Sequence, residues 1–286
     1  MSKLIYCMLL NLIVAASSLH AVIFKTTEIE DVTKEITADT MVLFNIAEVL
    51  MDTETSLGTQ AWRKYVRSRV DSQLHDKLTL FVFQNVPPKT PEPATANLIK
   101  SLQEKGVLVL AFTSRGRSEW YATQMPGIDQ ITEEMMLKID LDFSKTKLTY
   151  PLTKLNFYFK DYFHSGIIYA TNSIEKGRML SKLMATACYA PSKVVFVDDK
   201  ADSLESVETA MQELRIPFTG FAYARTVKEH ANFDPMVAHI QLDWLISYGK
   251  ILSDAEALQI KEEMFKDADP EAYFAGILQK WYYINQ

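Results

Sequence analysis

The sequence predicts an α/β fold: a Rossmann-like, mostly parallel sheet flanked by helices. Apolar runs of strand length alternate with amphipathic stretches of helix length, which is typical of successive βα units. Most of these runs are continuously apolar, as expected for strands covered on both faces. The 286 residues carry a net charge of −6 without any basic block, so we expect no nucleic-acid partner.

Residues 1–21 are predicted to be a signal peptide. Lys3 gives a short positive start, and Leu4–Ala16 is an apolar run too short to span a bilayer comfortably. Cleavage would follow Ser17, Ser18 or Ala21. We therefore expect an exported protein, periplasmic or secreted, with no stable membrane span after cleavage. An N-terminal membrane anchor or a buried first helix is the alternative.

Five strands and five helices are the clearest elements of the remaining chain. The strands are expected at Met41–Ile46, Val107–Phe112, Gly166–Ala170, Val194–Val197 and Phe218–Ala222. The helices are expected at Trp62–Leu74, Pro93–Lys105, Lys176–Ala187, Leu204–Leu214 and Pro235–Tyr248. A further helix should begin after Ser253, which forms a capping-box pattern with Glu256.

Residues 22–286 are expected to form one domain with cap-type insertions near 52–92 and 115–163. Both segments fit the βα pattern less well, and we expect them over the carboxyl ends of the strands, where open α/β sheets bind ligands. The aromatic residues of 157–163 are expected to pack in the core, with a ligand-stacking surface as the alternative. Cys188 lies in an apolar helical stretch and is expected to be a buried small side chain rather than a nucleophile.

Four short patches, taken in chain order, hold the candidate functional residues. Each follows a predicted strand or opens a predicted helix, so the sheet should bring them to one edge. They centre on Asn45 with Ala47, on Thr113 with Ser114, on Lys176, and on Asp198 with Asp199.

The four patches resemble the motifs of the haloacid dehalogenase-like (HAD) phosphohydrolase superfamily over residues 40–225. The stretches at 57–62 and 251–257 are similar to an exported branch of that superfamily in intracellular bacteria such as Legionella and chlamydiae. The resemblance implies that Thr113, Ser114 and Lys176 hold a phosphoryl group. It also implies that Asp198 and Asp199 belong to a magnesium site, which is made of hard oxygen ligands.

The first motif departs from the superfamily at both of its catalytic positions. Asn45 stands where the Asp nucleophile is expected, and Ala47 stands where the acid/base Asp is expected. An amide is a very poor nucleophile toward phosphorus, and loss of the general acid alone typically costs about 10²–10⁴-fold in rate. The Asn45 oxygen and the Ala47 carbonyl could still ligate Mg²⁺, but with one negative charge fewer we expect its binding to be weakened.

The same residues also have simpler interpretations. Thr113 could cap a strand end, Lys176 could be a solvated lysine at a helix start, and the two acids could cap the next helix. Arg115 and Arg117 could contact an anion or could be ordinary surface charges. Glu48 could replace the lost acid only if its side chain turned toward the site, and we expect it to point away. The five histidines form no paired zinc motif.

The sequence therefore predicts an exported pseudophosphatase that binds a phosphorylated small molecule or a protein partner without efficient turnover. An active magnesium-dependent phosphohydrolase with an atypical first motif is the first alternative. A host-interaction protein with a vestigial site is the second.

Overall fold

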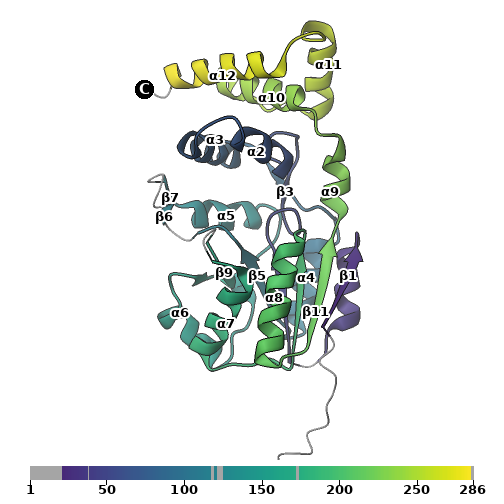
Figure 1. The fold of residues 1–286 in the computed structure, drawn as a ribbon, viewed down its shortest axis with the longest axis vertical. Helices are drawn as coiled ribbons and strands as arrows, with labels where there is room; N and C mark the ends of the chain where they lie inside the picture. The colour runs from purple at the N-terminus through teal and green to yellow at the C-terminus, as the bar shows by residue number, and fades with distance from the viewer. Residues whose placement is uncertain (1–20, 38, 117–118, 121–124, 172–173, 285–286) are drawn as a thin grey trace, which may run out of the picture.

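A seven-stranded sheet forms the lower half of the molecule (Figure 1). The computed structural model describes residues 21–284 except 38, 117–118, 121–124 and 172–173; the predicted signal peptide, apart from Ala21, and Arg117 lie outside the described residues. The strand order is β1-β11-β10-β2-β5-β9-β8. All neighbours pair in parallel except β8 with β9, so the predicted fold class is confirmed. The strands are β1 (Ala21–Thr26), β2 (Thr40–Asn45), β5 (Leu108–Thr113), β8 (Phe163–His164), β9 (Ile167–Tyr169), β10 (Lys193–Asp198) and β11 (Phe218–Tyr223).

The central strands are buried on both faces, as their apolar sequences predicted. In β2, Met41 and Leu43 belong to one core cluster, whereas Val42 and Phe44 belong to the other. This division follows from the two-residue period of a strand. The first cluster lies under α7 (Lys176–Ala187) and α8 (Ala201–Leu214), and the second under the 3-10 helix η2 (Ile29–Glu35), α4 (Thr95–Glu104) and α5 (Ile128–Leu137).

All five predicted strands are present to within two residues, and four of the five predicted helices are confirmed. The helix predicted at Trp62–Leu74 is wrong, because the chain breaks there into α2 (Gln60–Arg67) and α3 (Ser72–Asn85). Asp71 caps α3 by accepting a hydrogen bond from the backbone N–H of Leu74, which fixes a new helix start inside the predicted helix.

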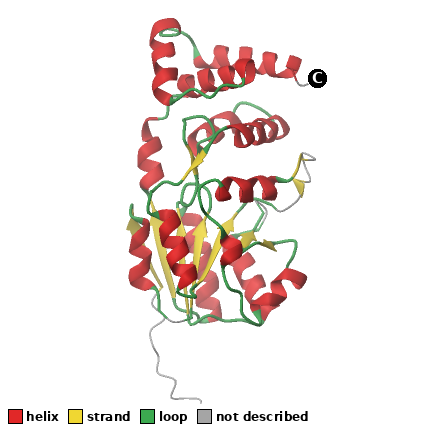
Figure 2. Cartoon of the chain, turned by 180° about the vertical axis from the view of Figure 1, so that it is seen from behind, coloured by secondary structure: helices red, strands yellow, loops and turns green. Residues whose placement is uncertain are grey.

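A layer of C-terminal helices lies at the far end of the molecule from the sheet (Figures 1 and 2). It consists of α10 (Pro235–Tyr248), α11 (Asp254–Met264) and α12 (Pro270–Ile284), and it is reached from β11 through α9 (Arg225–Glu229) and η5 (His230–Asn232). The capping box of Ser253 and Glu256 opens α11 as predicted. Apolar side chains of α10 and α12 share a core with α2 and α3, including Trp62, Leu242 and Trp281. The α2–α3 pair is thus held between the sheet and the C-terminal layer.

Residues 52–92 do lie over the carboxyl edge of the sheet, where β3 (Asp52–Thr53) pairs with β4 (Pro88–Lys89) beside α2 and α3. Residues 115–163 form two parts that pack in different places. The hairpin of β6 (Glu119–Trp120) and β7 (Met125–Pro126) leads into α5, which packs against α3. After η3 (Phe143–Lys145), the elements η4 (Leu152–Lys154) and α6 (Leu155–Tyr158) pack against α7. Whether the two segments are insertions stays a prediction.

Two expectations about side-chain burial need correction. Within the aromatic residues of 157–163, Phe159 and Phe163 are buried as expected, but Phe157 and Tyr158 are exposed. Cys188 is exposed because it is the C-cap of α7 in the left-handed conformation, beyond the buried face of the helix. Among the described helices, none combines the length and the apolar character needed to cross a bilayer.

Candidate functional site

The four sequence patches meet at the carboxyl edge of the sheet. β2 ends at Asn45, β5 at Thr113 and β10 at Asp198, on three adjacent parallel strands. Lys176 opens α7, whose N-terminus lies at the same edge. Hydrogen bonds join Asn45, Lys176, Asp198 and Asp199 into one cluster, which we call the crevice cluster. The order and position predicted for these residues agree with the structure.

Lys176 is a buried member of the cluster and not a solvated helix-start lysine. Its Nζ donates to Asp198 Oδ2 at 2.6 Å, to Asn45 Oδ1 at 2.8 Å and to the Phe112 carbonyl at 3.2 Å. An ammonium has three N–H donors, so all are in use. Burial lowers the pKa of Lys176, and the Asp198 carboxylate opposes that effect. In this arrangement Lys176 contributes positive charge to the crevice but has no donor left for a phosphoryl oxygen.

Asn45 is held on both ends of its amide. Its Nδ2 donates to the Ala47 carbonyl and to Asp199 Oδ1, each at 2.8 Å, while its Oδ1 accepts from Lys176. A flipped amide would place the oxygen against two acceptors and the nitrogen against an ammonium, so the network fixes the orientation. The Asn45 amide nitrogen therefore lies between two of the oxygens that the superfamily resemblance assigns to magnesium.

The residues present do not fit a magnesium ion in this arrangement. Mg²⁺ needs about six oxygen ligands in near-octahedral geometry. The Ala47 carbonyl and Asp199 Oδ1 both accept from the Asn45 amide, and Asp198 Oδ2 accepts from Lys176. The Asn45 amide nitrogen thus stands between the Ala47 carbonyl and Asp199, and the Lys176 ammonium stands against Asp198, where a cation bridging these oxygens would have to lie. The expectation of weakened magnesium binding stays a prediction, and no chemical step is derived through the metal.

The two acids of the cluster differ in environment. Asp198 is fully buried, pairs with Lys176 and accepts the backbone N–H of Lys200 through Oδ1 at 2.9 Å. No side chain caps α8, so the helix-capping interpretation of the acids is wrong. Burial, and next the charge of Asp198, raise the pKa of Asp199 to about 7. Asp199 can therefore change its charge near neutral pH.

A cavity of about 210 Å³ opens beside the cluster, and its walls are rich in cations. Thr113, Ser114 and Arg115 line it, and so does Lys176, whose three donors are already in use; that these residues hold a phosphoryl group stays a prediction. The Thr113 hydroxyl accepts the backbone N–H of Arg115 at 3.1 Å, which leaves its own O–H available to a ligand. The other cationic walls were not foreseen from the sequence: Arg63, Lys64 and Arg67 of α2, and Lys200.

Arg115 and Arg63 flank one aromatic ring in this cavity. Their guanidinium carbons lie 4.6 and 5.3 Å from the centroid of the Phe83 ring. Burial, and next the charge of Arg63, lower the pKa of Arg115 to about 9. Within the described part of the chain, Arg115 has no carboxylate partner and donates instead to the Thr132 hydroxyl at 2.8 Å. A half-buried cation without a described counter-charge is a favourable position for an anion.

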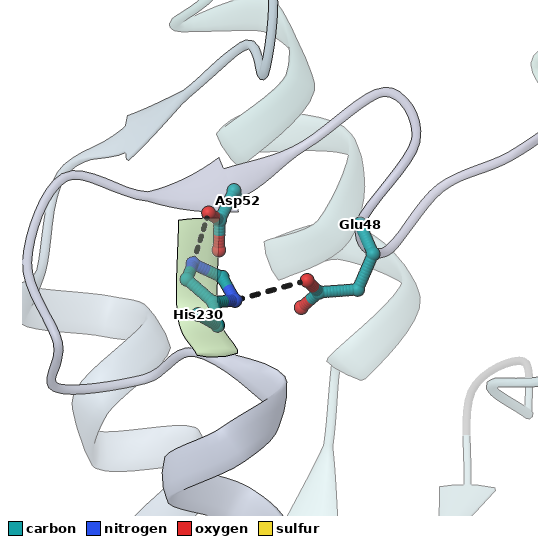
Figure 3. A group of neighbouring side chains, drawn as sticks. All are labelled: Glu48, Asp52 and His230. Carbon is teal, nitrogen blue, oxygen red and sulfur yellow. Dashed lines mark ion pairs between the residues drawn. The ribbon is translucent and has the colours of Figure 1, made fainter. Parts of the chain in front are cut away.

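Glu48 turns away from the crevice cluster, as expected, and joins a second cluster with Asp52 and His230 (Figure 3). We call this group the bridge. His230 Nε2 lies 2.9 Å from Asp52 Oδ2, and its Nδ1 lies 3.3 Å from Glu48 Oε2. The three side chains come from η5, from β3 and from the loop after β2. The bridge thus joins the sheet edge to the start of the C-terminal layer.

The bridge is better described as an ion-pair cluster than as a metal centre. Burial disfavours the imidazolium of His230, but the hydrogen bonds and charges of Asp52 and Glu48 outweigh it and raise the pKa to about 10. Glu48, Asp52 and His230 could each offer one ligand atom to a metal, and these three atoms lie within 4.8 Å of one another. A metal ligand must be a neutral imidazole, however, and here both ring nitrogens face carboxylates that favour the proton.

Comparison with known proteins gives the family of the chain. The model of a family described as "Protein of unknown function (DUF2608)" matches residues 25–258. A protein of Chlamydia trachomatis serovar D named "Putative outer membrane protein" is 23% identical over 271 residues, which are 91% of this chain and 97% of the relative. No solved structure matches the chain. With the family model covering most of its length, including the whole crevice cluster and the cationic cavity, the chain belongs to the DUF2608 family.

Proposed function

We propose that the protein is an exported HAD-like pseudophosphatase: it binds a phosphorylated ligand in the cationic cavity without efficient turnover. One observation carries the proposal. The side chain at the nucleophile position is an amide, Asn45, whose nitrogen donates to the Ala47 carbonyl and to Asp199 and whose oxygen accepts from Lys176. It offers phosphorus neither a carboxylate nucleophile nor space for a bridging cation.

Ligand binding is supported by what surrounds this amide. Ser114 and the Thr113 hydroxyl line the cavity, and Arg115 enters it without a carboxylate partner among the described residues. Charge-assisted hydrogen bonds from arginine to phosphate are among the strongest polar contacts in proteins. HAD-like ancestry is supported by the order of the four patches and by their meeting at one sheet edge.

Export is supported by the apolar N-terminal run and by the name of the chlamydial relative. Fractionation of cells that produce the full chain tests this part. The proposal expects the protein in the envelope or the medium, shortened by about 20 residues as a cleaved signal peptide requires. Full-length protein in the cytoplasmic fraction would contradict export and would leave the ligand-binding proposal standing.

Hydrolysis of a generic phosphomonoester with Mg²⁺ tests the proposed lack of turnover. The native chain is compared with Asn45→Asp/Ala47→Asp and with Asp198→Asn. The proposal expects no turnover by the native chain and a gain only in the double variant. Native turnover that Asp198→Asn abolishes would establish the alternative, an active phosphohydrolase with an atypical first motif.

Binding of propylphosphonate, measured by calorimetry, tests the ligand directly. The native chain should bind it, and Ser114→Ala/Arg115→Met should bind it much more weakly. Absence of binding by the native chain would favour a host-interaction protein with a vestigial site.

A further inference from the structure

The α2 side of the cavity carries more positive charge than one phosphoryl group can balance. The chain as a whole has a net charge of −6, yet the described residues that line the cavity include no Asp or Glu. They include six cationic side chains: Arg63, Lys64, Arg67, Arg115, Lys176 and Lys200. The sign of the cavity is thus opposite to that of the protein.

Four of the six cations have no ion-pair partner among the described residues, although the charge of Lys200 opposes the rise in the pKa of the neighbouring Asp199. Lys176 pairs with Asp198, and Arg63 lies 3.7 Å from Glu48. Within the residues that the structure describes, no carboxylate oxygen lies within ion-pair distance of Lys64, Arg67, Arg115 or Lys200. A phosphomonoester carries about −1.5 to −2 charges at neutral pH. One such group therefore leaves roughly two of the four unpaired cations without a partner.

The cations stand on two walls. Arg115, Lys176 and Lys200 follow strand ends or open a helix at the sheet edge, together with the hydroxyls of Thr113 and Ser114. Arg63, Lys64 and Arg67 belong to α2, in the layer above that edge (Figure 1). Lys64 and Arg67 are exposed. One cation of each wall, Arg63 and Arg115, lies over the ring of Phe83.

We infer that the cavity takes a small molecule with two anionic groups. One is the phosphoryl group at the strand ends, and the other is a second phosphoryl or carboxylate group held by Lys64 and Arg67 of α2. The part of the ligand between them crosses the cavity from the strand ends to α2. This inference rests on the proposed function and adds to it the chemical class of the ligand.

Titration of matched phosphonates into the full chain tests the inference. The probes are methylene-, propane-1,3- and pentane-1,5-diphosphonate, each beside the monophosphonate of the same carbon length. For at least one length the diphosphonate should bind about tenfold more tightly, as one added set of charge-assisted contacts would give. The advantage should shrink as ionic strength rises, because α2 presents exposed charges.

Lys64→Ala/Arg67→Ala should remove that advantage and bring the two affinities together. The matched control is Lys77→Ala/Arg178→Ala, which removes the same charges from exposed positions outside the cavity walls. It should keep the native ratio. An equal loss in both double variants would show a general charge effect and would overturn the inference.

The outcomes separate this inference from the proposal on which it rests. Binding of monophosphonates with no advantage for any diphosphonate overturns the second anionic contact and leaves the phosphoryl site standing. Absence of binding by either class overturns both.

Discussion

The crevice cluster and the bridge are two groups of polar and charged side chains that both begin around the end of β2, at Asn45 and at Glu48, and they differ in their surroundings. In the bridge, one imidazolium faces two carboxylates, and both of its ring nitrogens are used. In the crevice cluster the Asn45 amide and the Lys176 ammonium are also fully paired, but the cluster borders a cavity whose wall holds cations without an ion-pair partner among the described residues. One group is closed, and the other opens toward a ligand.

The difference assigns a stabilising role to the bridge and a ligand-binding role to the cavity beside the crevice cluster. A charged cluster that satisfies itself stabilises the connection between elements, here between the sheet edge and the C-terminal layer. A cluster that borders cations without counter-charges leaves those cations to be stabilised by an anionic ligand. We therefore expect substitutions in the bridge to act on stability and substitutions in the cavity wall to act on ligand affinity.

The largest effect is expected from Lys176→Met. It leaves Asp198 buried without its partner, and breaking a buried ion pair costs about 3–5 kcal/mol of unfolding free energy. Urea denaturation measures the loss. The double variant Lys176→Met/Asp198→Asn should recover part of it, because the uncompensated charge is gone. A loss below about 1 kcal/mol would show that the pair is not the centre of the cluster.

His230→Ala is expected to cost about 3 kcal/mol, since Glu48 and Asp52 then lose the imidazolium between them and keep only Arg63, 3.7 Å from Glu48, as a nearby cation. The raised pKa sets the sign of the pH dependence: the stabilisation is complete below pH 6.5 and is lost as the pH rises through about 10. The difference between native protein and variant should thus shrink at high pH. Phosphonate affinity that falls with unchanged stability would contradict the structural role of the bridge.

Arg115→Met should raise the stability of the protein and lower its affinity for phosphonate. It removes a half-buried cation with no described counter-charge, so we expect stability to rise by about 1 kcal/mol. Phosphonate affinity should fall about tenfold, because a charged hydrogen-bond donor to the ligand is lost. Lys77→Ala, at an exposed position outside the cavity walls, is the control. If Arg115→Met loses stability and keeps its phosphonate affinity, the cavity wall does not act on ligand binding as proposed.

The smallest effect is expected from Asp199. Because its pKa is raised to about 7, the carboxyl takes up a proton as the pH falls through neutrality and removes a negative charge near the cavity. Sulfate, whose own charge is constant in this range, should bind a few-fold more tightly at pH 6 than at pH 8. Asp199→Asn should show a flatter profile. If Asp199→Asn keeps the native pH dependence of sulfate affinity, that dependence comes from another titrating group.

The sheet and the crevice cluster could be predicted because their signals are local. Continuous apolar runs give the strands, and each run ends in a polar residue that the parallel sheet brings to one edge. The break between α2 and α3 also had a local signal, since Asp71 stands three residues before Leu74 in an N-cap position.

The bridge and the cationic wall had no such signal. His230 is 182 residues from Glu48 and pairs with it only because α9 and η5 return to the loop after β2. Arg63, Lys64 and Arg67 read as an ordinary solvated helix face. Their direction depends on how α2 packs between the sheet and the C-terminal helices, through the apolar contacts of Trp62 and Val66.

The affinity of propylphosphonate for the native chain, measured with EDTA and again with excess Mg²⁺, is the decisive measurement of whether the Asn45 amide replaces the metal. The Asn45 amide satisfies the oxygens that a cation would hold, so the account predicts the same dissociation constant in both conditions. Asn45→Asp, which replaces that amide by a carboxylate, should bind more tightly with Mg²⁺. Binding by the native chain that requires Mg²⁺ would contradict the account.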